Sequence, residues 1–296
     1  MRTFRSLYVD PLLEILEGQN PNTSFHPTLD NPRNGVFDTN PAQTLVLLVD
    51  FKTEGQNLWP VVSQQLQPLR ERGYLTYFNG TDVIEGPITV VATGNAPFNK
   101  VVENAHYRDI FFDAPLELLG ELAPYAQENY PEANDLVESS HYDSLEERKY
   151  LASYASDLTT SSATASDKNP AKQGQGHSGS APQHPAIYTA ANSYYASVKF
   201  ATALGYPIPP PFLTTSMRQR IRQQIAGAHR QGLKARYWNT PTWPRGLREY
   251  VWEVLVEEGV DYLNVDDLQG ATQGNWGVPR KRRGRGLSDW GMWNRR

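Results

Sequence analysis

Two charged side chains stand at the end of an apolar stretch of the chain. Residues 45–55 read LVLLVDFKTEG, so Asp50 closes the apolar stretch and Lys52 follows two positions later. If this stretch is a strand, residues i and i+2 point to the same side, and both side chains can enter one cavity. A carboxylate there can bind Mg²⁺ or Ca²⁺, and the lysine can hold a phosphate. The alternative interpretation is an ordinary strand end with a local ion pair.

A second group of candidate residues lies in KARYWNTP, at 234–241. Tyr237 and Trp238 can form the wall of a substrate pocket, with Arg236 or Lys234 reaching an anionic group. Alternatively, the aromatic rings only cover the end of the fold.

The acidic pair in NVDDL, Asp266 and Asp267, has two interpretations. It is either a second carboxylate site or the N-cap of a helix, and a cap is the simpler interpretation for one of the two. The six histidines show no metal-ligand spacing, and the sequence has no GxSxG, Walker or HExxH motif. The residues alone therefore give no complete catalytic constellation.

Strands and helices that would position these residues alternate along the chain. Helical periodicity and Gly or Pro signals predict helices over 4–17, 57–72, 214–231 and 246–259, with Pro68 kinking or shortening the second. Apolar runs predict strands at 44–50, 74–80, 86–94, 108–116, 192–200, 233–238 and 260–268. This alternation predicts a parallel sheet with crossover helices. Polar residues follow the carboxyl ends of its strands, where α/β barrels carry their sites: Asp50, Lys52, Asn95, Asp113, Trp238, Asn239, Asp266 and Asp267.

Composition limits the class of protein. A chain of 296 residues can form one barrel-sized unit, and the absence of cysteine excludes disulfides and cysteine nucleophiles. Residues 280–296 hold seven Arg or Lys and one Asp, a net of +6, so the rest of the chain carries about −10. That body matches a phosphate backbone poorly, and we do not expect nucleic acid as a partner. No apolar run reaches the ~20 residues of a transmembrane helix. Residues 155–185 are rich in Ser, Gly and Gln and predict a flexible insertion.

Six of the predicted strands, taken in order, resemble fungal proteins of the altered inheritance of mitochondria protein 6 family. The resemblance rests on LVLLVDFKTEG, GPITVVATGN, RDIFFDAPL, NSYYASVKF, ARYWNTP and GVDYLNVDDLQG. That family is similar to glycerophosphodiester phosphodiesterases, bacterial phosphatidylinositol phospholipases C and spider-venom sphingomyelinase D. The resemblance spans residues 2–270 apart from the insertion. It implies a TIM barrel that cleaves a phosphodiester, with a role in lipid metabolism.

The resemblance also implies the parts of the site. The superfamily uses two histidines as acid and base, and a Mg²⁺ held by a Glu-x-Asp pair and one more carboxylate polarises the phosphoryl oxygen. By this resemblance Asp50 matches the third metal carboxylate, Lys52 the phosphate-facing catalytic lysine, and Trp238 the aromatic residue that ends the seventh strand. Arg236 and Asp266 are candidate substrate-binding residues, although sphingomyelinase D-like enzymes have asparagine at the position of Asp266.

The family's first two strands, with their His-Asn-Asp-like and Glu-x-Asp motifs, have no counterpart here. We therefore expect residues 1–270 to form a phospholipase C-like α/β barrel without its first two strands, from a truncated chain, and residues 271–296 to form a disordered basic tail. We expect this chain to be inactive alone, although its parent is a phosphodiesterase. The alternative is a non-catalytic barrel that binds a phosphodiester or lipid headgroup. Secreted and mitochondrion-associated locations both fit, and a targeting segment would precede Met1.

Overall fold

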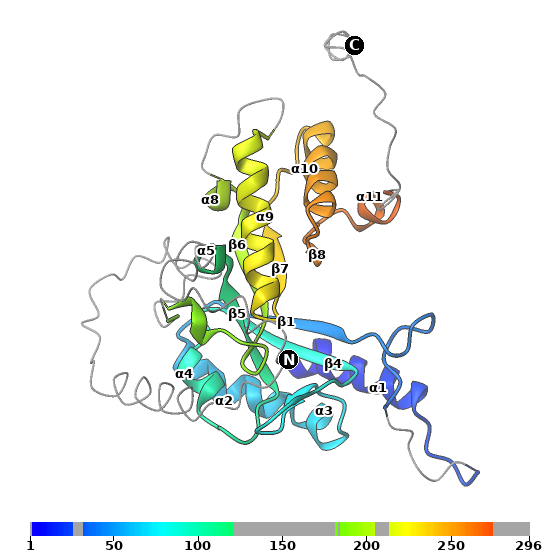
Figure 1. The fold of residues 1–296 in the computed structure, drawn as a ribbon. Coiled ribbons are helices and arrows are strands. Elements are labelled where there is room, and N and C mark those ends of the chain that lie inside the picture. Colours follow the sequence, from blue (N-terminus) through cyan, green and yellow to red (C-terminus); the bar gives the residue numbers. More distant parts are fainter. Residues whose placement is uncertain (1, 26–31, 121–180, 183, 205–212, 275–296) are drawn as a thin grey trace.

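A computed structural model describes residues 2–25, 32–120, 181–182, 184–204 and 213–274 (Figure 1). Its centre is a six-stranded parallel sheet that curls into half of a barrel. The strands, in spatial order, are β1 (Leu45–Phe51), β4 (Ile88–Gly94), β5 (Ile110–Pro115), β6 (Ser193–Lys199), β7 (Lys234–Trp238) and β8 (Tyr262–Leu263). The expected insertion and tail lie almost wholly outside the described residues.

The six strands of the family resemblance are confirmed as one parallel sheet. The last is shorter than predicted, because the chain leaves the sheet after Leu263 and Asp267 caps the short helix α11 (Leu268–Thr272). In the part of the chain that the structure describes, β1 and β8 are the two edges of the sheet and do not pair with each other. A half-barrel is therefore observed, and a closed TIM barrel is not confirmed.

Helices pack against one face of the sheet. They are η1 (Arg5–Val9), α1 (Asp10–Gln19), α2 (Gly55–Gln65), α3 (Gln67–Glu71), α4 (Phe98–Val102), α5 (Leu116–Gly120), η5 (Pro185–Ile187), α8 (Phe200–Leu204), α9 (Thr215–Arg230) and α10 (Arg245–Glu257). The single helix predicted over 57–72 is two helices, since Pro68 lacks an N–H donor and stands in the first turn of α3. The effect expected of Pro68 is thus confirmed.

Alternate residues of each strand belong to the core between sheet and helices. Ala92, Phe112, Ala196 and Ala235 are all buried there, together with apolar side chains from the helices. Because side chains alternate along a strand, the neighbours of these residues point to the other side of the sheet. We call that side, which faces away from the helices, the inner face.

A short hairpin lies at the amino-terminal ends of the strands. The single strand predicted over 74–80 is instead β2 (Tyr77–Phe78), which pairs antiparallel with β3 (Val83–Ile84). The Phe78 N–H donates to the Arg108 carbonyl at 2.7 Å, directly before β5. The hairpin therefore occupies the end of the sheet opposite to Asp50.

Candidate functional site

One polar side chain from each of five strands lies in a single row across the inner face. Asp50 of β1 is in register with Thr93 of β4, and the Thr93 hydroxyl donates to Asp113 Oδ2 of β5 at 2.8 Å. Arg236 Nη1 of β7 lies 3.8 Å from the same Oδ2, and it donates to Ser197 Oγ of β6 at 3.3 Å. We call these five residues the inner-face row. Parallel register and the two-residue period of a strand bring them together.

Arg236 is held on several sides. Its Nη2 donates to Asn264 Oδ1 at 2.5 Å, and its guanidinium carbon lies 5.9 Å from the centre of the Tyr195 ring. A guanidinium fixed in this way loses little further freedom when it binds an anion. Arg236 was predicted to bind substrate, and the structure places it inside the row.

Asp113 is the most deeply buried carboxyl of the row. Burial raises its pKa above the ordinary range, while Arg236, Ser197 and Thr93 act in the opposite direction and the charge of Asp50 adds to the rise. Within the described residues, Asp113 Oδ1 has no hydrogen-bond partner, and neither has the buried Trp238 Nε1. Buried polar atoms without a partner are uncommon, and a bound ligand would satisfy them.

Asp50 and Lys52 meet at the carboxyl end of β1, as the i, i+2 spacing predicts. Lys52 Nζ lies 2.6 Å from Asp50 Oδ2, and the lysine side chain is 75% exposed. Gly94, at the end of β4, has φ +70°, and a Cβ there would collide with Asp50 Oδ1 and lie 2.8 Å from Phe51 O. The glycine thus lets the ends of the two strands approach. The local ion pair is confirmed, and it places a cation at the end of the row.

The aromatic pair after Arg236 divides between the two faces. Trp238 lies on the side of the row, where Lys199 Nζ is 5.9 Å from its ring centre. Tyr237 points into the helix-side core, and its hydroxyl bonds with Gln224 Oε1 at 2.9 Å. The expectation that Tyr237 lines a pocket is therefore wrong. Lys234 stands at the amino end of β7, 3.9 Å from Asp261, and does not reach the row.

Loops after β7 and β8 enclose a cavity of about 280 Å³ beside the row. Its lining includes Asn239, Asn264, Asp266 and Arg248. Asn264 is shared with the row, and Asp266 is exposed at the edge of the cavity. Asp267 accepts from the Gly270 N–H at 2.9 Å, which confirms the cap interpretation for this residue of the acidic pair.

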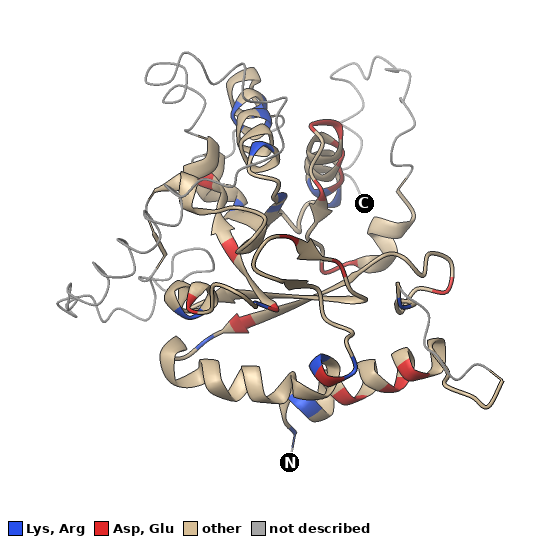
Figure 2. Cartoon of the chain, turned by 60° about the horizontal axis from the view of Figure 1, so that its bottom comes forward, with Lys and Arg blue, Asp and Glu red and all other residues tan. Residues whose placement is uncertain are grey.

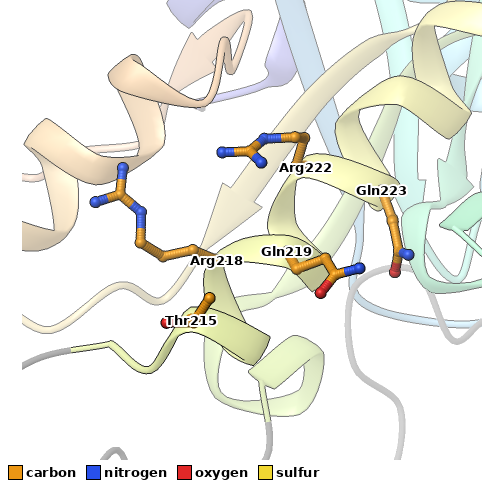
Figure 3. Close-up of a pocket in the computed structure, with 5 residues that line it drawn as sticks. All are labelled: Thr215, Arg218, Gln219, Arg222 and Gln223. Atoms are coloured by element: carbon orange, nitrogen blue, oxygen red, sulfur yellow. The ribbon is translucent and has the colours of Figure 1, made fainter.

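A second hollow lies beside α9, and its arginines serve in packing between helices. Arg218 and Arg222 extend from it toward α10, whereas Gln219 and Gln223 point away (Figure 3). The two arginines bond with carboxylates at the carboxyl end of α10, and Glu258 accepts from both at 2.9 Å. Figure 2 shows the basic residues along α9 and the acidic residues on α10. These arginines fasten two helices together.

The described residues hold no group of three or more histidine, aspartate and glutamate side chains that could bind a metal. The three-carboxylate set that the family resemblance implies is therefore not found in them. Of the described histidines, His106, His184 and His229, the first lies beside Gly80 of the hairpin and the last bonds with Asp261 at the amino end of β7, so these two lie toward the amino-terminal ends of the strands. None of the described helices is both long and apolar enough to cross a bilayer.

The sequence pattern predicts Asp113 at a strand end, but it does not predict the partners of Asp113. Thr93, Ser197 and Asn264 were also missed. The sequence pattern that could have identified such residues is a polar side chain at alternate positions inside an apolar strand, as in SYYASVK and KARYW. Such a residue points away from the helices and belongs to the inner face.

Comparison with known proteins places these features in a family context. Residues 1–113, which include Asp50, Lys52, Thr93 and Asp113, match the model of the AIM6-like phosphodiesterase domain. The chain is 32% identical over 272 residues to an altered inheritance of mitochondria protein 6 homolog of Arthroderma benhamiae, which covers 91% of this chain and 65% of that protein. It is 27% identical over 285 residues to altered inheritance of mitochondria protein 6 of Lachancea thermotolerans, with 92% and 53% covered.

The corresponding protein of Eremothecium gossypii is 28% identical over 271 residues, with 90% of this chain and 54% of that protein covered. The chain thus spans about half to two thirds of the length of these curated relatives. No solved structure matches the chain. These similarities support assignment of the chain to the altered inheritance of mitochondria protein 6 family.

Proposed function

We propose that this chain is a member of the altered inheritance of mitochondria protein 6 family and that its inner face binds a phosphodiester. The observation that carries the proposal is the inner-face row, in which Arg236 of β7 is held beside the buried carboxylate of Asp113. Lys52 and Lys199 add cations at the same end of the sheet. Arginine binds phosphate oxygens through directed hydrogen bonds, and lysine acts as a point charge.

The proposed roles follow the position of each residue. Arg236 and the Trp238 indole N–H donate to phosphate oxygens, and exposed Lys52 contacts the phosphate from solvent. Asp266 contacts the alcohol part of the ligand from the neighbouring cavity. For the family domain as a whole we propose hydrolysis of a phosphoric diester in lipid metabolism.

Mg²⁺ at Asp50 stays a proposal. Mg²⁺ is often held by one or two carboxylates together with phosphate oxygens and waters. The described residues bring one row carboxylate, Asp50, to the end of β1, where Lys52 already occupies its Oδ2. They do not fit the three-carboxylate site of the resemblance, so we derive no step through the metal.

One observation favours the alternative function, binding without turnover. Two of the three described histidines, His106 and His229, lie toward the amino-terminal ends of the strands, at the end opposite to Asp50. An acid or base must lie within hydrogen-bond reach of the proton that it transfers. We therefore propose that this chain binds a phosphodiester and that turnover needs residues other than the described histidines.

Binding and turnover can be tested together with glycerophosphocholine and bis(4-nitrophenyl) phosphate. We expect calorimetry to show binding of both, weakened about tenfold or more in Arg236→Met because a charge-assisted hydrogen bond is lost. The control is Lys234→Met, on the same strand but at its other end. Absence of binding to either probe would overturn the proposal. Turnover by this chain with Mg²⁺ present would overturn the binding-only alternative.

A further inference from the structure

Two large apolar side chains project into solvent from loops at the carboxyl end of the sheet. Trp243 is 76% exposed and lies between β7 and α10, and Leu268 is 71% exposed and begins α11 after β8. Among the large apolar residues that the structure describes, Phe25 alone is more exposed. Exposing side chains of this kind to water costs free energy, and they mark interaction surfaces when they gather.

The two loops are fastened to each other. Arg248 Nη1 lies 2.9 Å from Asp267 Oδ2, the carboxylate directly before Leu268. The Arg248 guanidinium also lies 4.7 Å from the centre of the Trp252 ring. Thr242 and Asp267, the neighbours of Trp243 and Leu268, both line the 280 Å³ cavity. The two segments that carry the apolar side chains therefore border one cavity, and we call their exposed residues the carboxyl rim.

The carboxyl rim lies at the same end of the sheet as the inner-face row, because all six strands are parallel. Exposed Lys199 and Arg245 also lie at this end, and neither is in an ion pair within the described residues. Asp266 is an exposed carboxylate there, so these three exposed groups sum to +1, in contrast to the acidic body of the chain. Such a surface meets little repulsion from lipid headgroups.

We infer that the carboxyl rim docks onto the surface of a lipid bilayer, with Trp243 and Leu268 entering the headgroup region. Tryptophan favours the membrane interface, where its ring is buried and its N–H stays hydrated. A protein partner would need about 800 Å² of complementary surface around an apolar centre. Here the segments that carry the two apolar side chains are joined by an ion pair, Arg248 with Asp267, rather than by an apolar centre, which suits separate insertion into lipid. Docking does not depend on the proposed function, but it would turn the inner-face row toward phosphodiester headgroups.

The test is co-sedimentation of the whole chain with phosphatidylcholine vesicles in high salt. These vesicles carry no net charge, and salt screens the basic residues at 280–296, so apolar insertion is measured. We expect Trp243→Ala/Leu268→Ser to weaken partitioning about tenfold or more, since each insertion buries a large apolar side chain. Ile84→Ser is the control, an exposed apolar residue at the other end of the sheet. Both rim residues are exposed, so the double variant should keep the thermal stability of the wild type.

A second readout places Trp243 in the bilayer directly. Lipids brominated on their chains should quench part of the tryptophan fluorescence, and Trp243→Phe should remove that part. Failure of the wild type to bind vesicles, or equal binding by the rim variant, would overturn the inference. So would a dimer in gel filtration that the rim variant converts to a monomer, because the rim would then be a protein interface. The rim variant should bind glycerophosphocholine normally, so this test and that of the proposed function can fail separately.

Discussion

Asp113 of β5 and Arg236 of β7 face each other across β6, with 3.8 Å between Oδ2 and Nη1. Both side chains are buried, and Ser197 of the intervening strand bonds with the arginine. In a buried pair the loss of hydration opposes the attraction between the charges. For Asp113 burial is the larger effect, and the pKa of its carboxyl is raised. The pair therefore orders the site at some cost in stability.

Arg236→Met should make stability fall more steeply with pH. Arg236 is the main group that lowers the pKa of Asp113, so its removal raises that pKa further. A carboxyl with a raised folded pKa costs nothing below its unfolded pKa of about 3.9, and stability is lost as pH rises from there through the folded pKa. Urea unfolding from about pH 4 to about pH 8 measures the slope. Asp113→Asn removes the titrating group and should lack this decline; parallel curves for all three proteins would contradict the prediction.

Gly94→Ala should destabilise the protein more than Gly259→Ala. Both glycines have positive φ, +70° and +89°, so alanine costs about 1–2 kcal/mol of backbone strain at each. At Gly94 the new Cβ also meets Asp50 and the Phe51 backbone, whereas nothing lies within 4 Å at Gly259. We expect an additional loss of about 1 kcal/mol or more for Gly94→Ala, from the forced shift of β1. Equal urea midpoints for the two variants would contradict this, because they would mean that the ends of β1 and β4 move apart at no cost in stability.

Glu258→Ala should destabilise the packing of α9 against α10. The Glu258 side chain is 3% exposed, and it accepts hydrogen bonds from Arg218 and Arg222. Loss of these charge-assisted bonds should cost about 1–3 kcal/mol of unfolding free energy. The control is Glu257→Ala, whose carboxylate pairs with Arg218 but is 63% exposed, and which should cost less than about 1 kcal/mol. A larger effect at Glu257 would mean that the exposed pair holds the helices.

Mg²⁺ titration calorimetry tests the proposed metal role of Asp50. We expect binding that Asp50→Ala abolishes and that Asp266→Ala leaves unchanged, since Asp266 lies in the neighbouring cavity. Lys52→Ala should strengthen Mg²⁺ binding, because Lys52 Nζ lies 2.6 Å from the oxygen that the ion would use. If neither the wild type nor Lys52→Ala binds Mg²⁺, Asp50 serves in this chain only as the partner of Lys52.

The sheet could be predicted from sequence because its strands are apolar runs between turn signals, and the approach of Asp50 to Lys52 follows from strand geometry. The partnership of Asp113 with Arg236 could not be predicted in this way. It depends on strand order and on a shift of register between β5 and β6, after Phe112. Likewise, Tyr237 and Trp238 are both amphipathic, and the side of the sheet on which the helices pack decides which of them joins the core.

The inner-face row takes one residue from each of β1, β4, β5, β6 and β7, so its members are neighbours in space but distant along the chain. Contacts between residues so far apart in the sequence form slowly, because each long loop must close before its strands pair. No single hairpin or helix contains enough of these residues to form part of the row alone. A ligand bound there would stabilise the completed sheet by mass action and slow amide hydrogen exchange in β1 and β7 alike. Binding at this site would thus report that the whole sheet has folded.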